Sequence, residues 1–361
     1  MIKRILLNDF RNFKKKGFMF SDGITVIVGP NASGKTNILE ALFLLSTGKS
    51  FRARIEEEMI SYSSEIARIK GTTDTTALEA VLTRGLIDIG NSVPEKVARK
   101  KLTVNGVSRR LLDFAGNFKA TLFGPWDLDL VTESPSLRRR FLDTVLFLVD
   151  REYRRVSLSY DKGLRQRNRL LYKMREDSSL SLGQGVSRSQ LLFWNQLLIK
   201  NGDYISQKRG ELIAFINLTK GLNDQLFQIE YDKSAISETR LEQYAEEEVA
   251  SATTLVGPHR DDFVFNIASC QAGNMKNRDL SSFGSRGEQR MAVLWLKLAE
   301  LMFVEAKTGE RPTLLLDDIF SELDYEHRKV VTRVSENQQT IITTADKHFL
   351  EKLKNFSEVL L

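Results

Sequence analysis

Cysteine, proline and long apolar runs are scarce in this sequence, and each scarcity excludes a class of protein. One cysteine, Cys270, occurs among 361 residues, so no disulfide can form within the chain, and a cytoplasmic location is expected. The longest apolar runs, at 145–149 and 313–316, are far shorter than the roughly 20 residues that span a bilayer, so no membrane segment is expected. Polar residues at positions 8 and 9 argue against a signal peptide.

The length and composition indicate a folded protein. At roughly 150 residues per domain, 361 residues correspond to two domains, or to one large domain with an insertion. Hydrophobic residues make up 42% of the chain and charged residues 28%, with 22 Gly and 6 Pro. These values exclude collagen-like and mostly disordered chains.

Positive charge is concentrated in one segment. The whole chain has a formal net charge of +6, whereas residues 138–176 alone contain twelve Lys or Arg and five Asp or Glu. Two interpretations are open: a surface that binds a polyanion, or a solvated helix face whose charges are met by acidic neighbours elsewhere in the fold.

The two ends of the chain are of one kind and the middle is of another. Strands at 4–7 and 24–28, then a Gly-rich loop and an apolar helix, begin an α/β domain. The β-rich residues 66–123, with Asn105-Gly106 as a hairpin turn, predict an antiparallel sheet beside the parallel one. Helical patterns fill residues 136–248, apart from an exposed Ser-rich loop at 178–183.

Beyond Leu255 the β-rich pattern returns. We expect one more long helix at 288–303 and strands at 263–267, 313–316, 340–343 and 359–361. The sequence therefore predicts one discontinuous α/β domain, formed by residues 1–125 and 251–361, with a helical arm domain at 126–250 inserted into it.

The segment 29–36 carries the pattern G-x-x-x-x-G-K-[ST] between an expected strand and an expected helix. Its backbone N–H groups form an anion-binding nest at a helix N-terminus. Lys35 can reach the β- and γ-phosphates of ATP, and the Thr36 hydroxyl can ligate Mg²⁺. The alternative, a Gly-rich turn without a ligand, is weakened by the strand–loop–helix placement. The predicted ATP-binding residues are Gly29, Pro30, Asn31, Ala32, Ser33, Gly34, Lys35 and Thr36.

An apolar strand that ends in Asp317 and Asp318 supplies the carboxylates that a P-loop requires. We expect Asp317 to bind Mg²⁺ through water and Asp318 to accept a proton from the attacking water, so the predicted catalytic residues are Lys35, Asp317 and Asp318. An apolar strand followed by two acids is common in α/β proteins, so this assignment depends on the P-loop. Asp is one methylene shorter than Glu, which would place the base less well and slow hydrolysis.

The segment Ser285-Arg-Gly287-Glu288 lies directly before the long helix. One interpretation is a capping box, Ser285-x-x-Glu288, that touches no ligand. Its position one helix upstream of the acidic strand is also similar to the signature motif of ABC-type and SMC-type ATPases. By that resemblance, Ser285 and Gly287 of one subunit bind the γ-phosphate held on the P-loop of the other. Asp324 would make a further contact across the same dimer.

Landmarks along nearly the whole chain resemble the RecF family of bacterial recombination and gap-repair proteins. The landmark segments are Asp9-Phe-Arg-Asn-Phe13, Gly48-Lys-Ser-Phe-Arg52, the segment from Phe123 to Val131, Ser134-Pro-Ser-Leu-Arg-Arg-Arg-Phe-Leu-Asp143, Gly257-Pro-His-Arg-Asp-Asp262 and Leu314-Leu-Leu-Asp-Asp-Ile-Phe-Ser-Glu-Leu-Asp324. Residues 177–250 match no recognisable landmark.

The resemblance implies a P-loop ABC/SMC-type ATPase head with an antiparallel β subdomain and an inserted helical arm. It implies a weak ATPase whose ATP-dependent homodimer binds DNA, prefers double-stranded DNA beside single-stranded gaps, and helps RecR and RecO to load recombinase. It also places Arg11 and Asn12 near the nucleotide, for which the alternative is an ordinary turn after a strand.

Two other functions share these motifs. A nucleotide-binding subunit of a transporter has a P-loop, a signature segment and an acidic strand, but it lacks a long helical arm and usually keeps a switch His, which is missing after the strand 340–343. A non-catalytic architectural DNA-binding protein would keep ATP only as a structural ligand.

Overall fold

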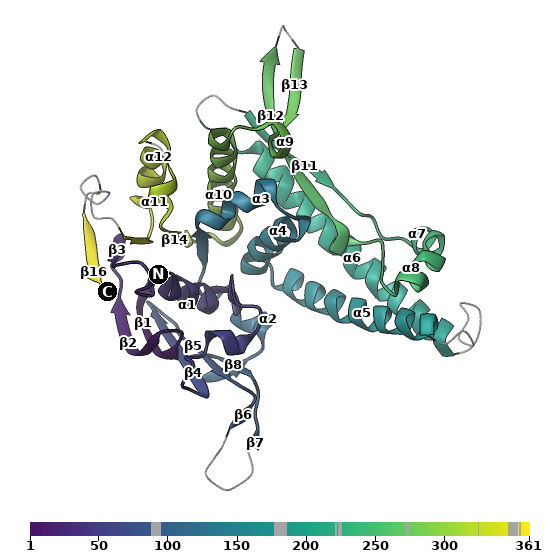
Figure 1. Ribbon diagram of the computed structural model, residues 1–361, viewed down its shortest axis with the longest axis horizontal. Helices are drawn as coiled ribbons and strands as arrows, with labels where there is room; N and C mark the ends of the chain where they lie inside the picture. Colours follow the sequence, from purple (N-terminus) through teal and green to yellow (C-terminus); the bar gives the residue numbers. More distant parts are fainter. Residues whose placement is uncertain are drawn as a thin grey trace. The chain divides into compact units, whose positions relative to one another are not determined.

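The computed structural model describes residues 1–361 except 88–94, 177–185, 221, 223–225, 272–273, 324, 346–352 and 354. The chain forms two compact units (Figure 1). The first unit contains Met1–Asp127 and Glu300–Leu361, and the second contains Leu128–Ala299. Residues 251–299, which we expected in the C-terminal part of the ATPase domain, therefore lie in the second unit. Among the described residues, no helix combines the length and the apolar character that a membrane crossing requires.

A five-stranded parallel sheet in the first unit positions the Gly-rich loop 29–34. Its order is β10 (Ala120–Phe123), β14 (Thr313–Asp317), β15 (Thr340–Thr344), β3 (Ile24–Val28) and β16 (Phe356–Leu360). Every residue of the four strands β10, β14, β15 and β3 is buried, which explains their continuous apolar sequences. Because the strands are parallel, the loops after β3, β14 and β15 meet at one edge of the sheet.

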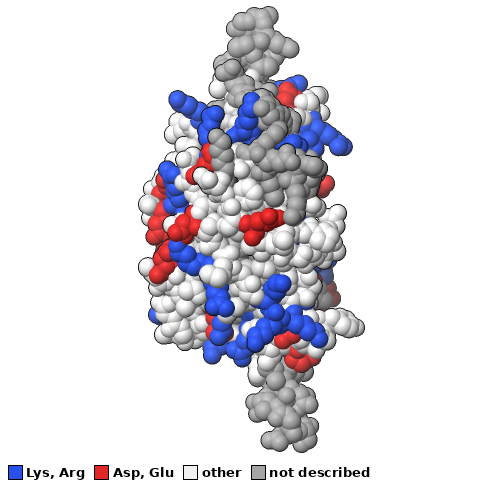
Figure 2. All heavy atoms as spheres, turned by 90° about the vertical axis from the view of Figure 1, so that its left-hand side faces the viewer, with Lys and Arg blue, Asp and Glu red and all other residues white. Residues whose placement is uncertain are grey.

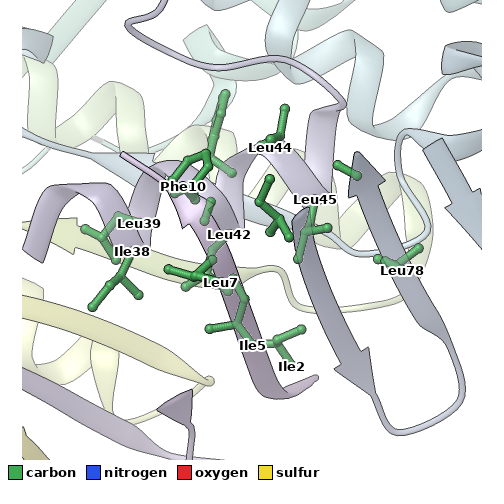
Figure 3. Close-up of a cluster of buried hydrophobic side chains, with 14 of the residues drawn as sticks. Ile2, Ile5, Leu7, Phe10, Ile38, Leu39, Leu42, Leu44, Leu45 and Leu78 are labelled. Atoms are coloured by element: carbon green, nitrogen blue, oxygen red, sulfur yellow. The ribbon is translucent and has the colours of Figure 1, made fainter. Parts of the chain in front are cut away.

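Helix α1 (Lys35–Thr47) follows the loop after β3 and forms the centre of the core. Figure 3 shows Ile38, Leu42 and Leu45 of α1 among the side chains of β1 (Ile2–Phe10). Each of these fully buried Leu or Ile side chains contributes roughly 1.5–3 kcal/mol to stability. Gly71 allows the close approach, because a Cβ there would lie 2.5 Å from Leu45 Cδ1. The apolar helix predicted after the Gly-rich loop is confirmed.

A six-stranded antiparallel sheet packs on the other side of this core. Its order is β2 (Phe13–Met19), β1, β4 (Ile66–Thr73), β5 (Ala77–Thr83), β8 (Lys100–Val104) and β9 (Val107–Arg109). Asn105 and Gly106 both have positive φ between β8 and β9, so the predicted hairpin is confirmed. Strand β2 was not predicted, because its run of three lysines hides the alternation of an edge strand.

The second unit is built on helices α4 (Pro135–Val149), α5 (Arg151–Glu176) and α6 (Val186–Leu218), with α3 (Asp129–Thr132) before them and α7 (Glu238–Gln243) and α8 (Ala245–Ser251) after them. The expectation of an all-helical middle segment is wrong at β11 (Leu226–Asp232), where Phe227 and Ile229 alternate with exposed residues. Strand β11 pairs with β12 (Asp262–Gln271), which pairs with β13 (Asn274–Asp279). The Ser-rich loop at 178–183 lies outside the described residues.

Four more helices precede or follow β14 in the sequence. Helix α9 (Leu280–Phe283) precedes α10 (Arg286–Thr308), which covers and extends the predicted helix 288–303. Helices α11 (Ile319–Glu322) and α12 (Tyr325–Ser335) follow β14. The two short strands β6 (Leu86–Ile87) and β7 (Glu95–Lys96) pair with each other in a two-stranded sheet.

The basic segment 138–176 serves both inside the second unit and at its surface. Arg167 is 2% exposed and donates to Glu248, Thr254 and Asn195, with an Nη2–Oε2 distance of 2.6 Å to Glu248. Arg138 binds Asp262, and Arg154 is buried. The exposed cations of α5 are Arg151, Arg155, Lys162, Arg165, Arg169, Lys173 and Arg175. The acidic-neighbour interpretation therefore holds for Arg138 and Arg167.

Candidate nucleotide-binding site

The loop between β3 and α1 has the shape of an anion-binding nest. Gly34 has φ 104°, and a Cβ at this position would lie 2.6 Å from Asn12 Oδ1, so only glycine fits. The loop leads directly into α1, whose first backbone N–H groups lack partners within the helix. Ser33 Oγ is buried and forms no hydrogen bond with any part of the chain that the structure describes. An oxyanion held by this loop would satisfy that hydroxyl.

Lys35 points into the same loop. Its side chain is buried, and its ammonium donates to the carbonyl oxygens of Gly29 and Pro30 at 2.7 and 2.9 Å. These bonds hold the positive charge at the mouth of the nest. A bound phosphate would meet a cation already placed there, and Lys35 would exchange its hydrogen bonds to the two carbonyl oxygens for bonds to the phosphate.

A hydroxyl and a carboxylate meet beside Lys35. Thr36 Oγ1 donates to Asp317, with distances of 2.8 and 3.1 Å to the two carboxylate oxygens. Thr343 Oγ1 donates to the same carboxylate at 2.6 Å, because β14 and β15 place Asp317 and Thr343 side by side in register. Hydroxyl and carboxylate oxygens are hard ligands of the kind that Mg²⁺ prefers, so these residues fit a magnesium ion.

Asp318 has a left-handed backbone, with φ 50° and ψ 25°, directly before α11. Its N–H donates to Thr343, which fixes the turn at the end of β14. A non-glycine residue in this conformation is held there by its surroundings, and such strain gathers at functional sites. The structure thus brings Lys35, Thr36, Asp317 and Asp318 to one edge of the parallel sheet.

Asn12, which is predicted to lie near the nucleotide, contacts the Gly-rich loop. It lies in the turn between β1 and β2, donates to Ser33 O at 2.9 Å and accepts a bond from Asn37 at 2.7 Å. Arg11, in the same turn, makes its side-chain bonds elsewhere, to Glu40 and to Glu58 O.

Glu40 is a fully buried carboxylate that orients two arginines. It accepts from Arg11 at 2.8 and 2.7 Å, from Arg52 at 3.1 and 2.8 Å, and from Ser50 at 2.6 Å. Burial raises the pKa of Glu40, but the hydrogen bonds from Arg11, Arg52 and Ser50 outweigh it, so the pKa lies below its usual 4.5. Glu40 is one turn after Thr36 on α1, and it therefore ties the arginines to the loop.

An open cavity of about 880 Å³ adjoins these arginines in the first unit. Its lining residues are Arg11, Asn12, Asn37, Arg52, Ile55, Glu57, Glu58, Ile60, Tyr62 and Arg84. The Tyr62 ring is 99% exposed, which leaves its face free to stack on a planar ligand. The cavity is large enough for the nucleoside end of a nucleotide whose phosphates lie on the loop.

Ser285 and Gly287 lie in the second unit, whereas the loop and the two aspartates lie in the first. The capping box is present: Ser285 N donates to Glu288 Oε2 at 2.7 Å, and Glu288 N donates to Ser285 Oγ at 3.2 Å. Burial raises the pKa of Glu288, but its bonds from Ser285 and Arg278 outweigh this and lower it. Both Ser285 and Gly287 are exposed, and a Cβ on Gly287 would have no atom within 4 Å. Asp324 lies outside the described residues.

Comparison with known proteins assigns the chain to the family that its landmark segments resemble. The model of the family described as RecF/RecN/SMC N terminal domain matches residues 1–361. The DNA replication and repair protein RecF of Herpetosiphon aurantiacus is 34% identical, over 96% of this chain and 93% of its own length. That of Clostridium novyi is 33% identical, over 95% and 92%. The chain belongs to the RecF family.

Solved structures of RecF share the fold. One, described as the recombination mediator protein RecF-ATPrS in the RecFOR pathway, is 29% identical, covers 99% of this chain and 96% of its own, and gives a TM-score of 0.83. A second, described as RecF-ATP, is 30% identical over 96% and 92%, with a TM-score of 0.81. The predicted α/β fold, an ABC/SMC-type ATPase head with an antiparallel β subdomain and a helical arm, is confirmed.

Sequence reasoning missed four residues of the site: Glu40, Arg52, Tyr62 and Thr343. Glu40 carried a signal, because it is a lone acid in an apolar helix and falls four residues after Thr36, on the same face. Arg52 stood inside a RecF landmark without an assigned role. Tyr62 and Thr343 carried no local signal in the sequence. The place of Tyr62 follows from the cavity that it lines, and that of Thr343 from its register opposite Asp317.

Proposed function

We propose that this chain binds ATP and Mg²⁺ in its first unit, and that two ATP-loaded copies form a dimer that binds DNA during recombinational repair. The observation that carries the proposal is the Thr36–Asp317 pair beside the nest formed by Gly34 and Ser33. Bound Mg²⁺ would neutralise charge on the β- and γ-phosphates. The RecF relatives, named for DNA replication and repair, support the DNA partner.

Each residue of the loop has a role in this proposal. Lys35 binds phosphate oxygens, while Thr36 and Asp317 hold the metal. Asn12 fixes the loop from outside, and the remaining loop residues, Gly29 to Gly34, offer backbone N–H groups. Asp318 accepts a proton from the attacking water.

The nucleoside end occupies the cavity beside Arg11 and Arg52, with Tyr62 as a stacking surface. Glu40 holds the two guanidinium groups at the wall of the cavity, so these side chains lose little conformational entropy when a ligand binds.

The second copy contributes Ser285 and Gly287. In the capping box Ser285 Oγ accepts a bond, so its hydroxyl proton remains free to donate to a phosphate oxygen. The open space above Gly287 lets a phosphate approach the start of α10. Asp324 would contact the partner across the same interface. Because each ATP would then bind both copies, ATP binding favours the dimer and hydrolysis dissolves it.

Hydrolysis is proposed to be slow, and RecR and RecO to be the proteins with which the dimer loads recombinase at gaps. The RecFOR pathway named for the solved relative supports these partners. We place this activity in the cytoplasm, where the DNA is. The RecF relatives span the helical unit as well as the head, which argues against a transporter subunit.

Measuring ATP turnover with and without gapped duplex DNA tests this function. A DNA-binding ATPase hydrolyses ATP slowly and changes its rate when DNA is added. Turnover that ignores DNA, together with no salt-dependent DNA affinity, would contradict the proposal. DNA binding without any turnover would indicate the architectural alternative.

A further inference from the structure

The outward face of the six-stranded antiparallel sheet is strongly basic. Strand register places Lys15 and Arg68 on either side of Asn8, and Arg68 and Lys101 on either side of Val81. Directly paired residues point to the same face of a sheet, so these three cations form one row across five strands. The buried Ile5, Leu7 and Ile69 occupy the opposite face, against α1.

Neighbouring rows add to this charge. Lys70 is paired with Leu6 in the next row, and Arg4 is paired with Met19 in the row after it. The outward positions of these three rows carry one carboxylate, Glu79. Glu79 lies 3.7 Å from Arg68 and 3.5 Å from Lys70, and both cations are 51% exposed. Such loose surface pairs contribute little, so the cations stay available.

We propose that this face, defined by Arg4, Lys15, Arg68, Lys70 and Lys101, is a docking surface for the phosphate backbone of double-stranded DNA. Strands lie about 4.8 Å apart, so the row from Lys15 to Lys101 is about 19 Å long. Duplex DNA carries one charge per about 1.7 Å of its axis when both strands are counted, so a length of duplex equal to this row holds roughly eleven phosphates. Figure 2 shows Lys and Arg side chains over the lower part of the face that lies on the left of Figure 1, as well as near its top, with Asp and Glu among them.

The chemistry of the face favours a nucleic acid backbone over other anionic partners. Its apolar residues are few, since Leu6 and Val81 are half-buried between the cations and only Met19, on the edge strand, is largely exposed. A membrane surface would need more apolar area to insert. The cations are spread over four strands without base-reading geometry, which fits sequence-independent phosphate contacts.

The test compares two triple variants that each remove three positive charges. The sheet variant is Lys15→Gln, Arg68→Gln and Lys101→Gln. The control is Lys162→Gln, Arg165→Gln and Arg169→Gln on α5, where all three residues are exposed. Affinity for a fluorescent gapped duplex is measured across a KCl series, with a non-hydrolysable ATP analogue present.

We expect the sheet variant to lose affinity and its salt slope to fall by about 0.9 for each phosphate contact removed, while the control keeps both. Equal affinity and slope in the sheet variant and the native chain would overturn the proposal. So would binding to phosphatidylserine vesicles that the sheet variant loses while its DNA affinity stays intact.

Two further measurements keep the outcome unambiguous. Arg68→Lys preserves the charge and should preserve DNA binding, whereas Lys15→Gln alone, on the edge strand, should weaken it without disturbing the fold. This inference rests on the proposed DNA binding. If the native chain binds no DNA, the proposed function fails; if the native chain and both triple variants bind alike, only the docking surface fails.

Discussion

At the scale of single residues, the site is organised by two acids, one with neutral hydrogen-bond partners and one with charged partners. Asp317 accepts hydrogen bonds from the hydroxyls of Thr36 and Thr343, and we propose that it binds the metal there. Glu40 is satisfied by two guanidinium groups and one hydroxyl, which prepares those arginines for a ligand. A buried carboxylate with charged partners is costly to disturb, so the role of Glu40 can be measured.

Replacing Glu40 by Gln is expected to lower the free energy of unfolding by about 3 kcal/mol, the lower end of the cost of breaking a buried ion pair, because Arg11 and Arg52 both reach solvent. Urea unfolding measures this loss. Glu57→Gln is the matched control, since Glu57 pairs with the largely exposed Arg99 and should cost under about 1 kcal/mol. Equal losses in the two variants would show that Glu40 does not organise the site.

The Glu40 contribution should also depend on pH. Its folded pKa lies below the usual 4.5, so the folded state binds the proton more weakly than the unfolded state. The stabilisation is therefore present above about pH 4.5 and is lost as the pH falls through the folded pKa. The difference in unfolding free energy between the native chain and Glu40→Gln should shrink in acid. A difference that grows as the pH falls would reverse the assigned direction.

Asp318→Asn should keep ATP binding and accumulate the dimer, because it removes the proton acceptor and leaves the phosphate-binding groups in place. Turnover should fall by roughly a hundredfold or more, the usual contribution of a general base. Single-turnover hydrolysis with labelled ATP measures the step. Normal hydrolysis by this variant would show that Asp318 is not the base.

At the scale of elements, the proposed function depends on the N-terminal ends of α1 and α10. The start of α1 is open and flanked by Lys35, while the start of α10 is closed locally by its capping box and exposed to a partner. Both termini present backbone N–H groups to anions.

Ser285→Arg should block dimer formation and leave ATP binding to the single chain intact, because its side chain would fill the space that a phosphate needs. Light scattering and nucleotide titration measure the two properties separately. Ser285→Ala removes the cap, at a cost of about 1 kcal/mol, without adding bulk, and Ser108→Arg adds the same bulk on β9. Loss of ATP binding by the single Ser285→Arg chain would mean that this helix does not act on the partner's nucleotide.

Local patterns predicted the elements that are strongly periodic or buried. The strands around Val26, Leu315 and Ile341, helix α1 and the Asn105-Gly106 turn were all readable from sequence. The missed strand β11 is stabilised by pairing with the distant strand β12, whereas β2 is the edge strand of a hairpin with the neighbouring β1 and has a composition unlike that of a strand. The contact between Asn12 and Ser33, and the arginine pair on Glu40, depend in the same way on strand and helix placement.

At the scale of the whole molecule, nucleotide binding should stabilise the chain. A ligand at a hundred times its dissociation constant raises the free energy of unfolding by about 2.7 kcal/mol. We expect this gain with ATP and Mg²⁺ for the native chain and its loss in Lys35→Ala, which removes the cation of the nest. Thermal unfolding with and without ATP measures it. An undiminished gain in Lys35→Ala would place the nucleotide elsewhere.

The central claim is that ATP joins two copies of this chain. Sedimentation velocity with a non-hydrolysable ATP analogue and Mg²⁺ tests it most directly. The account predicts a monomer without nucleotide, a dimer with the analogue, and a monomer in Lys35→Ala under both conditions. A native chain that stays monomeric at saturating analogue, or a dimer that forms equally well without nucleotide, would contradict it.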